Sequence, residues 1–194
     1  MSSPMIDFLL SRKSVPISAI REPGPSDAEI EAMIRVATHV PDHGRLAPWR
    51  FVLYRGKARE DIGEALVRLA EEREGPLSEG RREQERTRLS RAPLVIGVIS
   101  RPIAHERIPE WEQFLSAGAA AMSLVFAATA LGYATNWVTN WFSSDPKGRT
   151  LLGLSPDERV VALVHIGSSA AEIPERPRPA MTDVLSDYSG PRED

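Results

Sequence analysis

Residues 41–51 read PDHGRLAPWRF, and this stretch is the most informative part of the sequence. A proline, an acid, an imidazole, a glycine and a guanidinium follow one another in a short turn, Pro41–Arg45. The Ala47-Pro48-Trp49 step then leads into a run typical of a strand, Phe51–Arg55. Burial alone does not account for such a turn, so we interpret Pro41–Arg45 as a loop that binds a ligand.

A second cluster, Arg12-Lys13-Ser14, directly follows an apolar segment typical of a helix, Met5–Leu10. Guanidinium forks and hydroxyls bind phosphate oxygens. This cluster can therefore hold the phosphate of a ligand whose ring system lies on a nearby loop. Basic residues at the end of a helix also stabilise the helix dipole without any ligand. Taken alone, the cluster leaves both interpretations open.

Composition limits the classes of function. The chain has 194 residues and a formal net charge of −3, which favours one domain and gives no case for a nucleic-acid or membrane surface. Cysteine is absent, which excludes disulfides, thiolate catalysis and cysteine-based metal sites. The N-terminus lacks the pattern of a signal peptide, so we expect a cytoplasmic location.

The hydrophobic periodicity predicts strands separated by helices, which is typical of an α+β domain. Ser26 and Glu29 have the spacing of a capping box, and the helix that they begin must end by Val40 because Pro41 follows. The charge-rich segment 75–91 is interpreted as a solvated helix or a mobile flap. The remaining predicted helices are 4–12, 57–73 and a short one ending at 152; the predicted strands are 51–55, 93–100 and 159–167, with a weak element at 184–188.

The segment Trp111–Leu131 is the longest apolar stretch, and small residues dominate it. Its length would suffice for a membrane span, but Glu110 and Glu112 lie at its start and no basic flank follows. A helix that is apolar all round belongs in a core or an oligomer interface. We therefore expect a scaffold helix here.

No familiar catalytic or metal motif is present. His39 and His43 are four positions apart, but Pro41 lies between them, so we predict no metal site and regard His43 as a loop imidazole that binds a ligand. The G-x-S-x-G, G-x-G-x-x-G and P-loop patterns are absent. The segment from Trp137 to Trp141 is either a surface that stacks on a planar ring or core at the end of a strand.

Taken together and in this order, these segments resemble the FMN-dependent nitroreductase family, in its short bacterial, YdjA-like branch. Arg12-Lys13-Ser14 is similar to the family's R-[RK]-S, and Pro41–Trp49 to its P-D-H…P-W loop. Trp111–Gly118 resembles the start of its central helix, Trp137–Thr139 its W-x-[ST] segment, and Val164–Ser168 its L-x-x-G-[TS] strand end.

The resemblance implies an α+β fold with a central mixed or antiparallel sheet flanked by helices. Residues 1–194 would form one domain, with an extended tail from 174 to 194, and two chains would interlock into a homodimer with FMN at the interface. The implied cofactor-binding residues fall into four groups: Arg12, Lys13 and Ser14 on the phosphate; Pro41, Asp42, His43 and Arg45, with His39, reaching the flavin of the partner; Trp137, Val138 and Thr139 beside the isoalloxazine; and Arg176 and Arg178 as a basic pair.

The implied activity is hydride transfer from NADH or NADPH to a quinone, nitroaromatic or similar acceptor by a ping-pong mechanism. The flavin carries that chemistry, so no catalytic side chain is required. Ala47 replaces the amide residue that many members have, and Asn136–Thr139 replaces their Gly-Glu or Gly-Gly pair. Three alternatives stay open: a relative with other flavin chemistry, a non-catalytic flavin-binding or interaction protein, and a soluble domain without cofactor.

Overall fold

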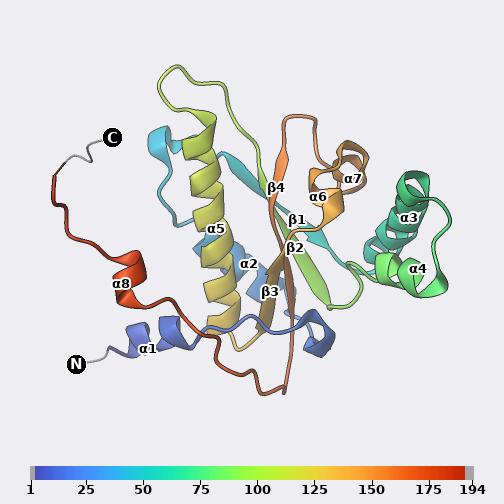
Figure 1. The fold of residues 1–194 in the computed structure, drawn as a ribbon, viewed down its shortest axis with the longest axis horizontal. Coiled ribbons are helices and arrows are strands. Elements are labelled where there is room, and N and C mark those ends of the chain that lie inside the picture. The colour runs from blue at the N-terminus through green and yellow to red at the C-terminus, as the bar shows by residue number, and fades with distance from the viewer. Residues whose placement is uncertain (1–2, 191–194) are drawn as a thin grey trace.

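The described part of the chain is residues 3–190, for which we have a computed structural model (Figure 1). Its helices are α1 (Pro4–Ser11), α2 (Asp27–Ala37), α3 (Lys57–Glu74), α4 (Glu79–Arg86), α5 (Glu110–Ala130), α6 (Trp141–Ser144), α7 (Pro146–Leu151) and α8 (Met181–Val184). Its strands are β1 (Trp49–Tyr54), β2 (Leu94–Ser100), β3 (Ala134–Val138) and β4 (Arg159–Gly167), and two 3-10 turns cover Ile17–Ala19 and His43–Arg45.

The strands form one four-stranded sheet in the order β1-β2-β4-β3. All three strand pairs are antiparallel, with Phe51 opposite Val98, Ile96 opposite Val164 and Asn136 opposite His165. The central strands β2 and β4 are buried nearly throughout, as their apolar runs predict. The α+β class and the antiparallel sheet are therefore confirmed, and β3 is an edge strand.

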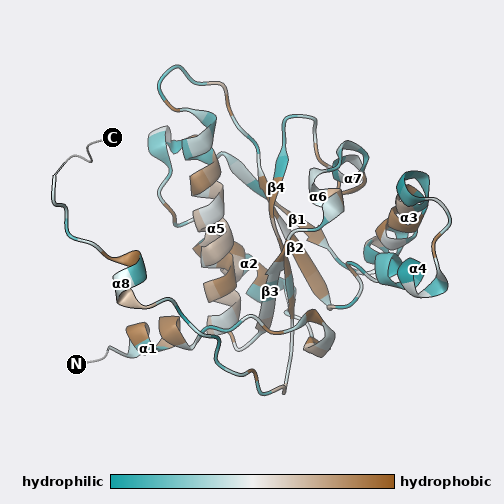
Figure 2. Cartoon of the chain, viewed as in Figure 1, coloured by the Kyte–Doolittle hydropathy of each residue, from teal (hydrophilic) through white to brown (hydrophobic). Residues whose placement is uncertain are grey.

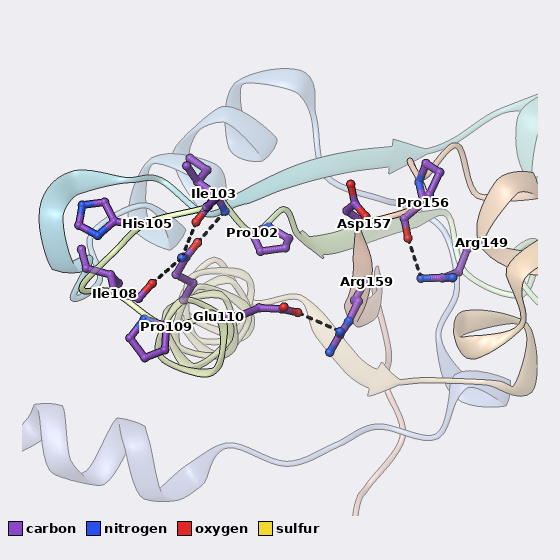
Figure 3. A pocket seen from close by; sticks show the side chains of 12 residues that line it. Pro102, Ile103, His105, Ile108, Pro109, Glu110, Arg149, Pro156, Asp157 and Arg159 are labelled. Atoms are coloured by element: carbon purple, nitrogen blue, oxygen red, sulfur yellow. Dashed lines mark hydrogen bonds and ion pairs between the residues drawn. The ribbon is translucent and has the colours of Figure 1, made fainter.

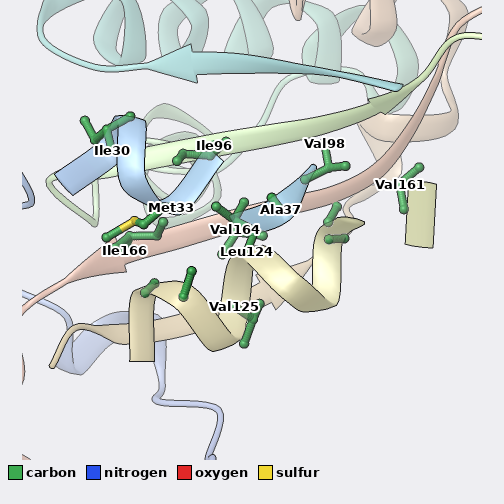
Figure 4. Packing of buried hydrophobic residues seen from close by; sticks show 14 of the residues in the cluster. Ile30, Met33, Ala37, Ile96, Val98, Leu124, Val125, Val161, Val164 and Ile166 are labelled. Atoms are coloured by element: carbon green, nitrogen blue, oxygen red, sulfur yellow. The ribbon is translucent and has the colours of Figure 1, made fainter. Parts of the chain in front are cut away.

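Helices cover both faces of the sheet (Figure 1). One face packs against α2 and α5, and its core includes Met33, Leu124 and Val164, all fully buried (Figure 4). The other face packs against α3, α6 and α7 through Leu66, Phe142 and neighbouring apolar residues. The fold thus has three layers, and α5 packs along one face of the sheet.

The helix α5 is the one helix in residues 3–190 that is long and apolar enough to cross a membrane by length and composition. It packs instead against the sheet, where Ala117, Ala120, Ala121 and Leu124 are fully buried. Figure 2 shows that α5 is largely apolar, in contrast to the polar helix α4 on the other side of the molecule. The expected scaffold helix is confirmed, and part of its apolar surface stays uncovered in the single chain.

The helix expected within 75–91 is present but has one buried side chain, and the weak element expected at 184–188 is displaced. The charged segment 75–91 contains α4, which is tied to α3 by ion pairs such as Arg82 to Glu71 at 2.7 Å, and its Glu85 is fully buried rather than solvated. The weak element predicted at 184–188 is absent there; one helical turn, α8, lies slightly earlier, closed by the Leu185 amide on the Met181 carbonyl. In the described residues 174–190 of the predicted tail, side chains are exposed almost throughout.

Candidate cofactor site

The cluster Arg12-Lys13-Ser14 lies beside the outer edge of β3. The next residue, Val15, donates its amide to the Thr135 carbonyl at 2.9 Å and accepts the Asn136 side-chain amide at 2.6 Å. The Arg12 guanidinium donates to the Ser14 hydroxyl at 3.3 Å. A cationic fork and a hydroxyl are therefore held together at the open edge of the sheet, which is the donor set that a phosphate needs.

The tail begins next to this cluster. Lys13 donates to the Ile173 carbonyl at 2.8 Å, and its ammonium lies 3.6 Å from the Glu175 carboxylate. Arg178 pairs with the same carboxylate at 3.3 Å. Lys13 and Arg178 thus share the Glu175 carboxylate, and Arg176 is exposed in the same segment; a binding role for Arg176 and Arg178 stays a prediction.

Trp137, Val138 and Thr139 stand at the end of the same edge strand. Trp137 is 38 % exposed, whereas Val138 packs partly against the core of α3, α6 and α7. In an antiparallel strand the N–H and C=O groups of one residue point to the same edge, and this edge alternates along the strand. Because the Thr135 carbonyl faces Val15, the Trp137 N–H points to the open edge too.

The loop after α2 has an unusual backbone. Gly44, Arg45 and Ala47 have positive φ angles of 70°, 56° and 46°. The Asp42 carboxylate accepts the amides of Leu46 and Ala47 at 3.0 and 2.8 Å and so holds this turn closed. Left-handed conformations at residues other than glycine cost energy and persist where the surroundings enforce them, which marks Pro41–Ala47 as a functional candidate.

The start of α5 fixes this loop. The His43 ring donates from Nδ1 to the Glu112 carboxylate at 2.6 Å, and the Ser116 hydroxyl donates to the Pro41 carbonyl at 2.7 Å. Because a carboxylate can only accept, Nδ1 carries the proton and Nε2 remains for another partner. The sequence assigned no role to Glu112 or Ser116; their signal is a polar pair at i, i+4 spacing near the start of a largely apolar helix. His39, in contrast, lies just beyond α2 and donates from Nδ1 to the Arg35 carbonyl in the last turn of that helix at 2.8 Å.

The predicted site residues fall into two clusters that do not meet within one chain (Figure 1). The Phe8 ring of α1, which precedes Arg12, contacts Phe126 near the end of α5, with ring centroids 6.3 Å apart. His43 contacts Glu112 at the start of the same helix. These two points on α5 are about 21 Å apart at ~1.5 Å per residue.

A pocket of about 670 Å³ lies elsewhere, and none of the predicted cofactor residues lines it. It opens between the loop before α5 and the start of β4, where Arg159 pairs with Glu110 at 2.9 Å (Figure 3). Between the lining residues Asp157 and Arg159, hydrogen bonds from Arg50 hold the pKa of Glu158 below its ordinary value. His105 lines both this pocket and a smaller one that includes His43 and Gly44. The pocket therefore borders the Pro41–Ala47 loop, and none of Arg12, Lys13 and Ser14 lines it.

An antiparallel sheet packed against a long helix rich in small residues, with a basic cluster at its open edge, defines the class of this α+β protein. The profile of the nitroreductase family matches residues 11–168, and the chain belongs to this family. Among curated proteins it is 32 % identical over 166 residues to a protein of Haemophilus influenzae, provisionally named an NAD(P)H nitroreductase, covering 84 % of this chain and 87 % of that protein. It is 27 % identical to YdjA of Escherichia coli K12, which has the same provisional name, over 91 % of this chain and 97 % of YdjA.

Solved structures share the fold. A nitroreductase-like family protein from Bacillus cereus superposes with a TM-score of 0.80 at 20 % identity, over 98 % of both chains. A nitroreductase from Bacteroides fragilis, whose crystal structure contains bound FMN, gives a TM-score of 0.73 at 19 % identity, over 96 % of this chain and all of that one (100 %). The family and fold expected from the sequence are thus confirmed.

Proposed function

We propose that this protein is an FMN-dependent oxidoreductase that takes hydride from NADH or NADPH and passes it to a quinone, a nitroaromatic or a similar small acceptor. The observation that carries the proposal is the pairing of Arg12 and Ser14 at the open edge of β3, in a chain of the nitroreductase family. The names of the curated relatives support the nicotinamide, and the FMN-bound neighbour supports the flavin.

The residues at this edge fit an FMN molecule. Arg12 and Ser14 supply charged and neutral donors for a phosphate, and Lys13 lies beside them. The outward N–H of Trp137 lies two residues beyond Thr135, about 7 Å along the strand, where it can donate to an acceptor atom of a bound ring. A backbone donor in this position compensates for the missing Gly-Glu or Gly-Gly pair, because it does not depend on the side chain.

A homodimer completes this site in the proposal. His43 and the Pro41–Arg45 loop lie at the far end of α5 from Arg12, so a second copy must bring its loop to the flavin of the first. The single chain leaves large apolar side chains exposed on α1, on α5 and on the tail; they are Met5, Ile6, Leu9, Leu10, Trp111, Phe114, Leu115, Met181, Val184, Leu185 and Tyr188. Apolar surface of this extent is typical of a protein interface, and a second copy of the chain is its occupant here.

The protein's own part in the reaction is binding and positioning. When bound, FMN would supply the hydride chemistry between the nicotinamide and the acceptor. Arg12 and Ser14 hold the phosphate, the β3 edge orients the ring, and the loop of the partner subunit narrows the space above it. One pocket then serves reductant and acceptor in turn, which gives ping-pong kinetics. We place this activity in the cytoplasm, in one domain of residues 1–194 with an extended tail from 174.

An anaerobic absorbance spectrum of the purified protein tests the proposal. A flavin band that bleaches on addition of NADPH or NADH supports the cofactor and the reductive half-reaction. A flavin band that persists with both nicotinamides favours the non-catalytic flavin-binding alternative, for which the altered Asn136–Thr139 segment is the supporting observation. Absence of a flavin, with no binding of added FMN, contradicts the assignment of Arg12–Ser14.

A further inference from the structure

The most charged segment of the chain contains a fully buried carboxylate, Glu85 on α4. It forms ion pairs with Arg81 and with Arg88, the latter at 2.8 Å, and it accepts the indole N–H of Trp141 at 3.1 Å. Burial raises the pKa of Glu85, but hydrogen bonds from Arg88 and Trp141 and the charges of Arg88 and Arg81 outweigh it, so the pKa lies below its ordinary value. Glu85 is therefore an ionised group with donors from separate parts of the fold.

Two of these donors, Trp141 and Arg88, lie at or contact the residues that follow β3. Trp141 begins α6, and Arg88 donates to the side-chain oxygen of Asn140 at 3.3 Å. Arg73 of α3 lies over the Trp141 ring, 4.3 Å from its centroid, and pairs with Asp145 at 3.9 Å. Asn140 and Trp141 directly follow Trp137–Thr139, the segment proposed to lie against the flavin ring.

The residue before the Trp137–Thr139 segment is also connected to Arg88, through His165. The fully buried His165 ring donates from Nε2 to the Arg88 carbonyl at 3.0 Å, since a carbonyl can only accept. His165 lies opposite Asn136 in the β3–β4 register. The Asn136 side chain also donates a hydrogen bond to the carbonyl of Val15, which directly follows Arg12-Lys13-Ser14. Arg88 is thus held at its backbone by β4 and at its side chain by Glu85, and it connects to both sides of Trp137–Thr139.

A buried ion pair is a poor source of stability, because desolvation offsets most of its electrostatic attraction. Its directional hydrogen bonds instead fix one arrangement of the groups that it joins. From this network, and resting on the proposed function, we propose that Glu85 is a positioning residue: through Arg88 and Trp141 it sets how the Trp137–Thr139 segment meets the flavin. The helix α4 then acts as a brace for the cofactor site from the opposite face of the sheet.

Two variants test this inference against a matched control. Trp141→Phe keeps an aromatic ring under Arg73 but removes the donor to Glu85, and Glu85→Gln removes the charge. The control, Arg82→Gln, breaks the 2.7 Å pair between α4 and Glu71 of α3, which loosens α4 at a point away from Glu85. For each protein the FMN dissociation constant, the flavin reduction potential and the thermal unfolding temperature are measured on the intact chain.

We expect both test variants to bind FMN about tenfold more weakly, the effect of one hydrogen bond to a charged group, and to shift the reduction potential. The control should lose unfolding temperature while its FMN affinity and potential stay at the wild-type values. Wild-type values in Trp141→Phe, or an equal loss in Arg82→Gln, would show that α4 is merely structural and overturn the inference. If Glu85→Gln does not fold, the FMN affinity and reduction potential of Trp141→Phe alone test the inference. A wild-type protein that binds no FMN would instead refute the proposed function, and this inference with it.

Discussion

A heterodimer with Arg12→Ala in one subunit and His43→Ala in the other should retain one intact flavin site. In a two-fold symmetric dimer, each proposed site takes Arg12 from one chain and His43 from the other. One site of the heterodimer therefore has both residues and the second site has neither. If Arg12 and His43 of the same chain shared a site, each site of the heterodimer would lack one of them.

The expected magnitudes follow from the contacts of the two residues. Arg12 lies near the Phe126 end of α5 and His43 at the Glu112 end, about 21 Å away along the helix, so one chain does not bring them together. Loss of a hydrogen bond from a guanidinium to a phosphate costs about 1.5–3 kcal/mol, or roughly 10- to 100-fold in affinity. Loss of one hydrogen bond from an imidazole costs about 1 kcal/mol, or roughly fivefold in affinity.

The assay is a titration with FMN, followed by quenching of flavin fluorescence. The two subunits are co-expressed with different affinity tags and purified as the heterodimer, and both homodimeric variants serve as controls. We expect one FMN per dimer to bind with wild-type affinity and a second to bind more weakly than in either homodimer. Two weakened sites, one matching each homodimer, would refute the reasoning that places the site across two chains.

Three further results are expected. Deletion of residues 174–194 should weaken dimerisation at least tenfold in sedimentation experiments, because it removes the exposed apolar side chains of the tail, and an unchanged dimer would contradict that role. Ala47→Gly should raise the free energy of unfolding by about 1 kcal/mol in chemical denaturation, because Ala47 has a φ of 46°; no gain would mean that this backbone is unstrained. Burial lowers the pKa of His165, so stability should fall as pH drops below the unfolded value of about 6.5, by up to about 1.4 kcal/mol per unit, and His165→Gln should flatten this dependence in thermal denaturation.

Local signals in the sequence predicted most of the fold correctly. The capping box at Ser26 and Glu29 is present, with Ser26 donating from its backbone amide to the Glu29 carboxylate at 2.8 Å, and α2 ends at Ala37, before Pro41. The strand predicted at 159–167 is β4 with the same bounds. Such signals depend on neighbours within a few residues. They therefore predict local structure without knowledge of the rest of the chain.

The errors arose where distant partners decide the outcome. Glu85 cannot be distinguished from Glu83 by sequence, because its burial depends on Trp141 of α6 and Arg88 beyond α4. The turn α8 is too short to carry a periodic signal. The left-handed backbone of Arg45 and Ala47 runs against the preference of both residue types, so sequence propensity cannot reveal it.

The binding roles at the candidate site follow from resemblance to a family more than from the periodicity or spacing of the residues themselves. Nothing in Arg12-Lys13-Ser14 alone indicates that it lies beside β3, which is more than a hundred residues further along the chain. The binding roles of these residues, and of Pro41–Arg45, remain predictions that the heterodimer experiment addresses. What the fold adds is their placement: two clusters, one at each end of α5.

This placement links cofactor binding to assembly through a single helix. The buried face of α5 forms the core with Ala117 and Leu124, and its first turns hold the His43 loop through Glu112 and Ser116. Its remaining face is apolar and uncovered, with Trp111 65 % and Leu115 61 % exposed. If a second copy covers that face, the same contact that stabilises the dimer also carries each loop to the other chain's β3 edge. A change on the exposed face of α5 that dissociates the dimer should therefore release the flavin too, even though none of the residues changed would touch it.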